Sequence, residues 1–192
     1  MKEGYAIVSR FIGSHNMSSE ARADHDYYAT APEAAEWLLK IENLQNNIWE
    51  CACGEGHLSR VFEERGYNVR STDLIDRNFG QGGVDFLQQN DIWRGDIVTN
   101  PPYREAEQFI KHGLDIVPDG SKVCMFLKIQ FLEGKARKKL FAEHPPKRVW
   151  VSSSRIKCGN NGNFSNSSSM MALAWYIWEK GYVGDTVLKW FN

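Results

Sequence analysis

The chain has 192 residues, a length that suits one α/β domain and leaves little room for a second. A hydrophobic content of 42% and seven tryptophans fit a folded globular protein, and no apolar run approaches the roughly 20 residues of a membrane helix. The net charge of -1 means that a nucleic-acid-binding surface, if there is one, must be local. Residues 1–13 lack a secretory pattern, so we expect a cytoplasmic protein with no membrane contact.

The elements can be predicted in chain order from apolar periodicity and from glycine and proline positions. We expect helices at 32–44, 57–65, 104–116 and 133–143. We expect strands at 47–52, 68–72, 96–99, 122–129, 148–152 and 171–178, with a very short one at Val84. This alternation predicts an α/β fold with a mostly parallel central sheet of about seven strands and helices on both faces. Residues 13–26 and 153–170 have low propensity for either element and are expected to be irregular.

The cysteines at positions 51, 53, 124 and 158 lack the paired spacing of a zinc site. Three of them fall in or beside predicted strands. We therefore expect reduced core thiols and no metal.

A glycine-rich turn follows the first of the parallel strands, in Glu50-Cys-Ala-Cys-Gly54-Glu-Gly56. Glycines allow positive φ and let a ligand lie against the backbone at the carboxyl edge of an α/β sheet. Asp73, after the next strand, is placed to accept hydrogen bonds from two ribose hydroxyls. The acidic Glu55 would repel a pyrophosphate, so a cationic ligand without phosphates fits the turn better. A tight turn with no ligand remains the alternative.

The sequence Asn100-Pro101-Pro102-Tyr103 ends a later strand. Two prolines remove two backbone donors, so the turn offers acceptors: the side-chain carbonyl of Asn100 and the backbone carbonyl of Pro101. With the flat ring of Tyr103 beside them, these acceptors suit an NH2 group on a planar system. Acceptors that hold the hydrogens of such a nitrogen would localise its lone pair for attack on a methyl group.

The ordered set Thr30-Ala-Pro32, Glu50 to Gly56, Asp73, Asp85-Phe86 and Asn100 to Tyr103 resembles small prophage-type adenine-specific DNA N6-methyltransferases. These belong to the class I S-adenosylmethionine-dependent superfamily, and the resemblance implies its Rossmann-like fold. The stronger motifs lie within residues 24–103, and weaker likenesses extend over most of the chain. Residues 1–30 would form an N-terminal arm with a cofactor-contacting loop, and residues 31–192 a single methyltransferase domain.

The resemblance implies a role for each matched residue. Thr30 would hold the methionine carboxylate of S-adenosylmethionine, Asp73 the ribose, and Asp85 the adenine amine, with Phe86 stacked nearby. Asp85 and Phe86 are equally compatible with a strand end and core. The remaining cofactor contacts would come from Glu50, Cys51, Ala52, Gly54, Gly56 and Leu74. Asn100, Pro101, Pro102 and Tyr103 would bind a flipped adenine, because chemistry on a base requires its removal from the stack.

The substrate implied by the resemblance is DNA, contacted by Lys128, Phe131, Arg137 and Phe164. A local basic patch at residues 135–139, with Lys147 and Arg148 after it, would contact phosphates or form a solvated helix face. The chain departs from larger DNA methyltransferases because it has no separate target-recognition domain. Residues 14–26 and 153–169 would have to supply specificity, with a homodimer as one way to complete the surface.

Three alternatives stay open at this point. RNA methyltransferases acting on adenine or guanine and protein-glutamine methyltransferases use a similar Asn-Pro-Pro-Tyr sequence. A catalytically silent binding subunit with the same fold is the alternative from another class of function.

Overall fold

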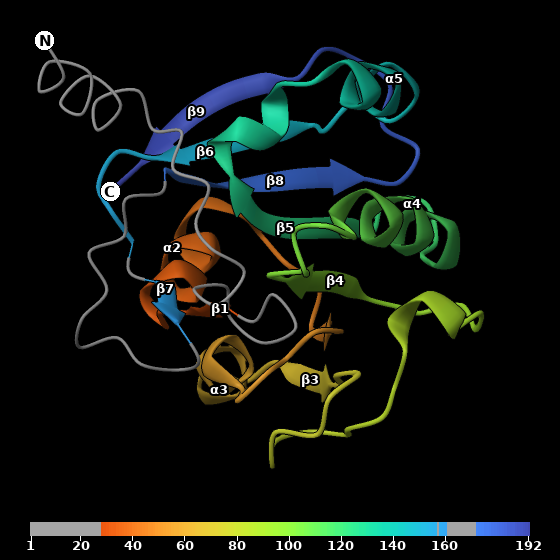
Figure 1. Cartoon of the computed structure of the whole chain (residues 1–192). Coiled ribbons are helices and arrows are strands. Elements are labelled where there is room, and N and C mark those ends of the chain that lie inside the picture. Colours follow the sequence, from red (N-terminus) through yellow and green to blue (C-terminus); the bar gives the residue numbers. More distant parts are fainter. Residues whose placement is uncertain (1–27, 157, 161–171) are drawn as a thin grey trace, which may run out of the picture.

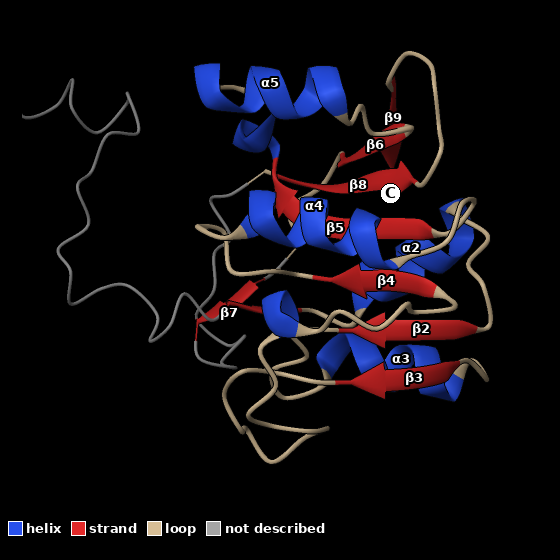
Figure 2. Ribbon diagram, turned by 90° about the vertical axis from the view of Figure 1, so that its right-hand side faces the viewer, coloured by secondary structure: helices blue, strands red, loops and turns tan. Residues whose placement is uncertain are grey.

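The computed structural model describes residues 28–156, 158–160 and 172–192, which form a seven-stranded sheet and a small two-stranded sheet. The strand order of the large sheet is β3-β2-β4-β5-β8-β6-β9 (Figures 1 and 2). Its strands are β2 (Asn47–Glu50), β3 (Asn68–Ser71), β4 (Asp96–Thr99), β5 (Lys122–Lys128), β6 (Arg148–Ser152), β8 (Leu173–Glu179) and β9 (Val187–Phe191). Only β8 pairs antiparallel with its neighbours, so the predicted mostly parallel seven-stranded sheet is confirmed.

Helices cover both faces of this sheet (Figure 2). The helices are α2 (Glu33–Ile41), α3 (His57–Glu64), α4 (Ala106–Ile116) and α5 (Lys135–Glu143), with 3-10 turns η3 (Phe86–Gln88) and η4 (Ile129–Leu132). Apolar residues of α2 and α3 belong to one core cluster, and those of α4 and α5 to the other. The central strand β5 contributes residues to both clusters, because Val123, Met125 and Leu127 face the α4 side whereas Cys124 and Phe126 face the α2 side.

The two-stranded sheet joins segments that are far apart in the chain. In it, β1 (Tyr28–Thr30) pairs antiparallel with β7 (Cys158–Asn160), and Thr30 lies opposite Cys158. The pair lies beside α3, away from the β6–β9 end of the large sheet (Figure 1). Sequence periodicity did not predict this sheet, because each of its strands has only three residues.

The expected strand at Val84 is wrong. Residues 73–84 instead form a compact loop, with a single bridge between Thr72 and Gln81, and the 3-10 turn η3 follows it. The seventh strand is β9, which was not predicted and which adds to β6 at the end of the sheet. Within the described residues, no helix combines the length and the apolarity that crossing a membrane requires.

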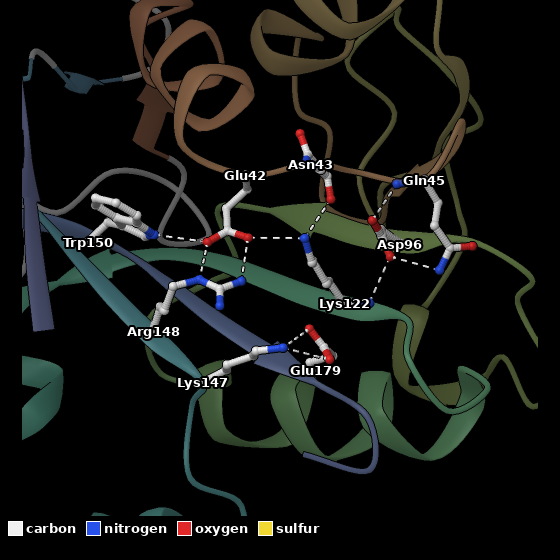
Figure 3. Close-up of polar contacts among 9 residues, drawn as sticks. All are labelled: Glu42, Asn43, Gln45, Asp96, Lys122, Lys147, Arg148, Trp150 and Glu179. Atoms are coloured by element: carbon white, nitrogen blue, oxygen red, sulfur yellow. Dashed lines mark hydrogen bonds and ion pairs between the residues drawn. The ribbon is translucent and has the colours of Figure 1, made fainter. Parts of the chain in front are cut away.

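A network of charged residues lies where the parallel strands begin (Figure 3). Glu42, just after α2, accepts hydrogen bonds from Lys122, Arg148 and Trp150. Burial would raise the pKa of Glu42, but the bonds from Arg148, Trp150 and Lys122 outweigh it and lower the pKa below its ordinary value. The network therefore ties α2 to β5 and β6 by a buried, ionised carboxylate.

Candidate active site

The predicted functional segments meet at one edge of the large sheet. The arrowheads of β2, β3 and β4 point to the same side in Figure 2, and each of the three predicted motifs follows one of these strands. The glycine turn follows β2, Asp73 follows β3, and Asn100 follows β4. Because β2 lies between β3 and β4, the carboxyl ends of all three strands are neighbours.

The glycine turn and Asp73 are bonded to each other. The backbone N–H of Gly54 donates to Oδ2 of Asp73 at 2.8 Å, and that of Ile75 donates to Oδ1 at 2.9 Å. Gly54 and Gly56 have φ values of 56° and 80°, and Gly56 immediately precedes α3. Both positions thus use the left-handed conformation that favours glycine. The carboxylate of Asp73 is held at the mouth of the turn and keeps further acceptor capacity for hydroxyl groups.

The loop after Asp73 packs onto the glycine turn. The ring of Phe79 lies so near Gly56 that a Cβ added there would come within 2.3 Å of it. Arg60, on α3, stacks over the same ring, with its guanidinium carbon 4.6 Å from the centre of the Phe79 ring. The thiol of Cys53 donates to the carbonyl of Phe79 at 3.8 Å. The loop therefore fixes the turn from one side.

Glu50 is a buried acid at the end of β2, with 2% of its surface exposed. Burial raises its pKa to about 8, although the hydroxyl of Ser59 donates to it and opposes that rise. Ser59 also shares a hydrogen bond of 2.7 Å with the hydroxyl of Ser71 on β3. Burial therefore favours the neutral form of Glu50, and a cationic group beside it would favour its ionisation.

The cysteines of the turn are reduced thiols. Cys51, Cys53 and Cys124 are free and buried. Burial raises the pKa of Cys53 to about 12 and that of Cys51 well above its ordinary value. Neither thiol of the turn is therefore a nucleophile at neutral pH. Among the residues that the structure describes, no group of three or more His, Cys, Asp or Glu side chains is arranged to hold a metal ion.

Asn100 and the two prolines form a rigid turn between β4 and α4. The side-chain Nδ2 of Asn100 donates to Oγ1 of Thr30 at 2.8 Å. The carbonyl of Pro102 accepts from the N–H of Glu105 at 3.0 Å, and this bond closes the turn. Pro101 is a buried residue, and no backbone amide among the described residues donates to its carbonyl. The carbonyl groups of Asn100 and Pro101 are the acceptors that the sequence predicted here.

A lysine lies beside the tyrosine of this turn. The ammonium of Lys128, at the end of β5, is 4.4 Å from the ring centre of Tyr103. Two further predicted substrate residues pack together next to it: Phe131 is 8% exposed, and the guanidinium carbon of Arg137 is 4.8 Å from its ring centre. Arg137 also donates to the carbonyls of Gln130 and Glu133. The DNA contacts of Lys128, Phe131 and Arg137 stay predictions, and Phe164 lies outside the described residues.

Three further residues predicted to contact the cofactor differ in their exposure and in their contacts. Leu74, next to Asp73, is 59% exposed, as an apolar surface for a ring requires. The carboxylate of Asp85 accepts from the N–H of Leu87 at 3.0 Å and so caps η3. Phe86 is 2% exposed, and its ring centre lies 4.9 Å from that of Phe109. The core alternative therefore accounts for the position of Phe86, and its stacking role stays a prediction.

The expected basic patch divides into two parts. Helix α5 carries the exposed residues Lys135, Lys138 and Lys139, the last of which lies 3.7 Å from Glu143 on the same helix. Lys147 is instead paired with Glu179 at 2.7 Å, and Arg148 with Glu42, in the network where the parallel strands begin. Including Lys147 and Arg148 in the patch was therefore wrong, because their charges are already neutralised at the opposite edge of the sheet.

Sequence reasoning missed Ser59 and Phe79. Ser59 lies on the buried face of α3, where a small polar residue among apolar ones was the available signal. Phe79 is followed by Gly80 and two further glycines, and nothing in that sequence shows that its ring reaches Gly56.

The fold is that of the class I methyltransferases, as comparison with solved structures shows. A protein of Listeria monocytogenes, provisionally assigned as a class I S-adenosylmethionine-dependent methyltransferase, matches with a TM-score of 0.58 and 13% identity over 83% of this chain. One of Pyrococcus horikoshii, provisionally assigned as an RNA methyltransferase, matches with a TM-score of 0.58 and 15% identity over 81% of this chain. A SAM-dependent O-methyltransferase of Thermotoga maritima matches with a TM-score of 0.57 and 11% identity over 80% of this chain.

The chain spans 63% of the Listeria protein, 87% of the Pyrococcus protein and 67% of the Thermotoga protein. No protein-family model and no curated protein sequence matches it. These neighbours differ in what they are named for, so the shared fold does not identify the acceptor of this chain.

Proposed function

We propose that the chain is an S-adenosylmethionine-dependent methyltransferase that transfers a methyl group to an exocyclic amine, with N6 of adenine in DNA as its substrate. The observation that carries this proposal is the position of Asn100-Pro101-Pro102-Tyr103 at the carboxyl end of β4. That strand lies beside β2, whose glycine turn is bonded to Asp73. A turn that offers acceptors thus lies next to a turn suited to a nucleoside.

The residues of the glycine turn fit this cofactor. Asp73 is held at the mouth of the turn, where its carboxylate can accept from the ribose hydroxyls. Glu50 is buried nearby and gains a counter-charge if the methionine ammonium is placed beside it. Exposed Leu74 offers an apolar surface to the adenine. When bound, S-adenosylmethionine supplies a methyl group on a sulfonium sulfur, and this sulfur leaves as a neutral thioether. The acceptor nitrogen gains the methyl group and releases a proton to solvent.

The acceptor-binding residues act on the amine. Its lone pair is delocalised into the ring, which makes it a poor nucleophile. The carbonyls of Asn100 and Pro101 would accept hydrogen bonds from its two N–H groups and hold the nitrogen in the geometry for in-line attack. Tyr103 would stack on the ring of the flipped base. Preorganised acceptors of this kind stabilise the positive charge that develops on nitrogen as the methyl group arrives.

Charge supports a nucleic acid as the carrier of this base. Lys128 lies against Tyr103, and α5 presents Lys135, Lys138 and Lys139 to solvent on the α4 side of the sheet. These lysines are a local cationic surface on a chain whose net charge is -1. Phosphate contacts by such residues position a strand without reading its sequence.

Binding of the cofactor can be measured by titration calorimetry of the purified protein with S-adenosylmethionine. We expect saturable binding that weakens in Asp73→Ala, since that variant loses the acceptor of the ribose. Asn100→Ala is the matched control, because it alters the acceptor site and should leave cofactor affinity near that of the wild type while abolishing turnover. Absence of binding at millimolar cofactor would contradict the proposal that the chain is a methyltransferase and would favour a catalytically silent binding subunit.

A further inference from the structure

Asn100 is bonded to a residue of a different sheet, 70 positions away in the chain. Its Nδ2 donates to Oγ1 of Thr30 at 2.8 Å, across the gap between the end of β4 and the end of β1. An asparagine amide has an oxygen and an NH2 group of nearly equal size, so its shape alone does not fix which of them faces a ligand. In this structure the NH2 end of the amide lies on Thr30, so the amide oxygen points away from that hydroxyl.

Thr30 is itself held in place. It is 4% exposed, and its backbone is paired with Cys158 of β7. The chain then enters α2, whose Ala34 carbonyl accepts from the indole N–H of Trp175 at 2.9 Å. Trp175 is fully buried in β8, a central strand of the large sheet. The backbone of Thr30 is thus held in place. Its hydroxyl accepts from the Asn100 amide in this structure, whereas a hydroxyl that donated to the amide oxygen would hold the amide in the opposite orientation.

We infer that Thr30 is a positioning residue, which engages the NH2 end of the Asn100 amide so that its carbonyl oxygen is presented to the acceptor amine. The inference rests on the proposed function, and it gives Thr30 a role different from the methionine-carboxylate contact that the resemblance implies. The orientation matters because an amide turned by half a revolution would direct its own NH2 group at the NH2 group of the substrate. Two donors would then face each other, and the developing charge on the nitrogen would lose its acceptor.

The first test is a comparison of Thr30→Val with Thr30→Ser. Valine keeps the shape of threonine without the hydroxyl, whereas serine keeps the hydroxyl. We expect Thr30→Val to lower kcat about tenfold, as the loss of one hydrogen bond in the transition state does, and to leave the Kd for S-adenosylmethionine within about twofold of the wild type. Thr30→Ser should restore kcat. Should Thr30→Val fold poorly, Thr30→Ala, which removes the hydroxyl without adding an apolar branch, serves for the same measurements.

The second test reads the amide directly and needs no turnover. In 15N-labelled protein, the side-chain NH2 signals of Asn100 are assigned by their loss in Asn100→Asp. We expect slow proton exchange at this group in the wild type and in Thr30→Ser, and faster exchange in Thr30→Val. Ser59→Ala is the matched control, since it removes a buried hydroxyl that is bonded to Glu50 instead, and it should leave the Asn100 signals unchanged.

Two results would overturn the inference. One is a raised Kd for S-adenosylmethionine in Thr30→Val with kcat unchanged, which would make Thr30 a cofactor contact. The other is unchanged exchange of the Asn100 amide in both Thr30→Val and Thr30→Ala. A wild type that binds no cofactor would contradict the proposed function instead, while the amide exchange would still report on the contact between Thr30 and Asn100.

Discussion

Glu50 illustrates how a single residue can combine a cost in stability with the binding role that we propose for it. Its carboxyl is buried, its described partner is the hydroxyl of Ser59, and its pKa is about 8. In the unfolded chain the same group ionises near its ordinary value of 4.5. Between these two values the unfolded chain gives up a proton that the native protein keeps, so stability falls as pH rises.

Glu50→Gln should therefore stabilise the cofactor-free protein toward alkaline pH. Glutamine keeps an acceptor for Ser59 but cannot ionise. The advantage of the variant over the wild type should be small near pH 5 and grow to a few kcal/mol near pH 8. Urea unfolding of both proteins without cofactor at several pH values measures it. Curves that stay parallel over this range would show that Glu50 is not protonated in the native state.

At the scale of single residues, the sequence allowed predictions for residues that lie within one short sequence motif. Glu50, Gly54 and Asn100 were predicted because the residue types and their spacing imply a turn at a strand end, and the structure has such turns after β2 and β4. The bond between Asn100 and Thr30 could not be predicted, because it depends on where a three-residue strand, β1, is placed in space. Phe79 was missed for the same reason, since a ring in a glycine-rich loop has no periodicity to place it.

Among the elements, the loop at residues 73–84 differs most from expectation. A short strand was predicted at Val84, but Gly80, Gly82 and Gly83 favour a turn, and the loop folds back so that Gln81 bridges to Thr72. The edge strand β9 was missed because four of its five residues are exposed, which removes the alternation that marks a half-buried strand. The central strands were predicted within a few residues of their ends because continuous apolar runs mark buried parallel strands.

The packing of Phe79 on Gly56 can be tested with two glycines of similar conformation. Gly56 and Gly66 have φ values of 80° and 86°, but a Cβ at Gly66 meets nothing within 4 Å. Gly66→Ala measures backbone strain alone, about 1 kcal/mol. Gly56→Ala adds the overlap with the Phe79 ring and should cost about 2 kcal/mol more.

Phe79→Ala removes that overlap, so the cost of Gly56→Ala should fall toward that of Gly66→Ala in the Phe79→Ala background. Denaturant unfolding of the single and double variants supplies the four free energies. Additive costs of Gly56→Ala and Phe79→Ala would mean that the ring does not lie on the glycine turn.

On the scale of the whole molecule, the two ends of the parallel strands carry different groups of polar residues. The carboxyl ends of β2, β3 and β4 carry the candidate site, whereas the beginnings of β4, β5 and β6 carry the charged network around Glu42 and Asp96 (Figure 3). Burial raises the pKa of Asp96, and bonds from the N–H groups of Lys122 and Gln45 oppose that rise. Stability and binding should therefore respond to different substitutions.

Glu42→Ala should destabilise the fold without weakening cofactor binding. It leaves Arg148 and Lys122 without their buried counter-charge, at a cost of about 3 kcal/mol. Glu179→Ala breaks the more exposed pair with Lys147 and should cost less than about 1 kcal/mol. Thermal unfolding gives the two stabilities, and calorimetry at a temperature where both variants are folded gives the cofactor affinity. A large loss of affinity in Glu42→Ala would show that the two ends of the strands are coupled.

Methyl transfer to an exocyclic amine is tested most directly by identification of the methylated product. The protein is incubated with tritiated S-adenosylmethionine and, separately, with unmethylated genomic DNA, total RNA or cell extract, and each acceptor is then digested and its labelled unit identified. We predict N6-methyladenine in the DNA digest and none with Asn100→Ala. Label recovered as methylglutamine would contradict the DNA substrate, and no label in any acceptor from a protein that binds the cofactor would contradict the claim of methyl transfer.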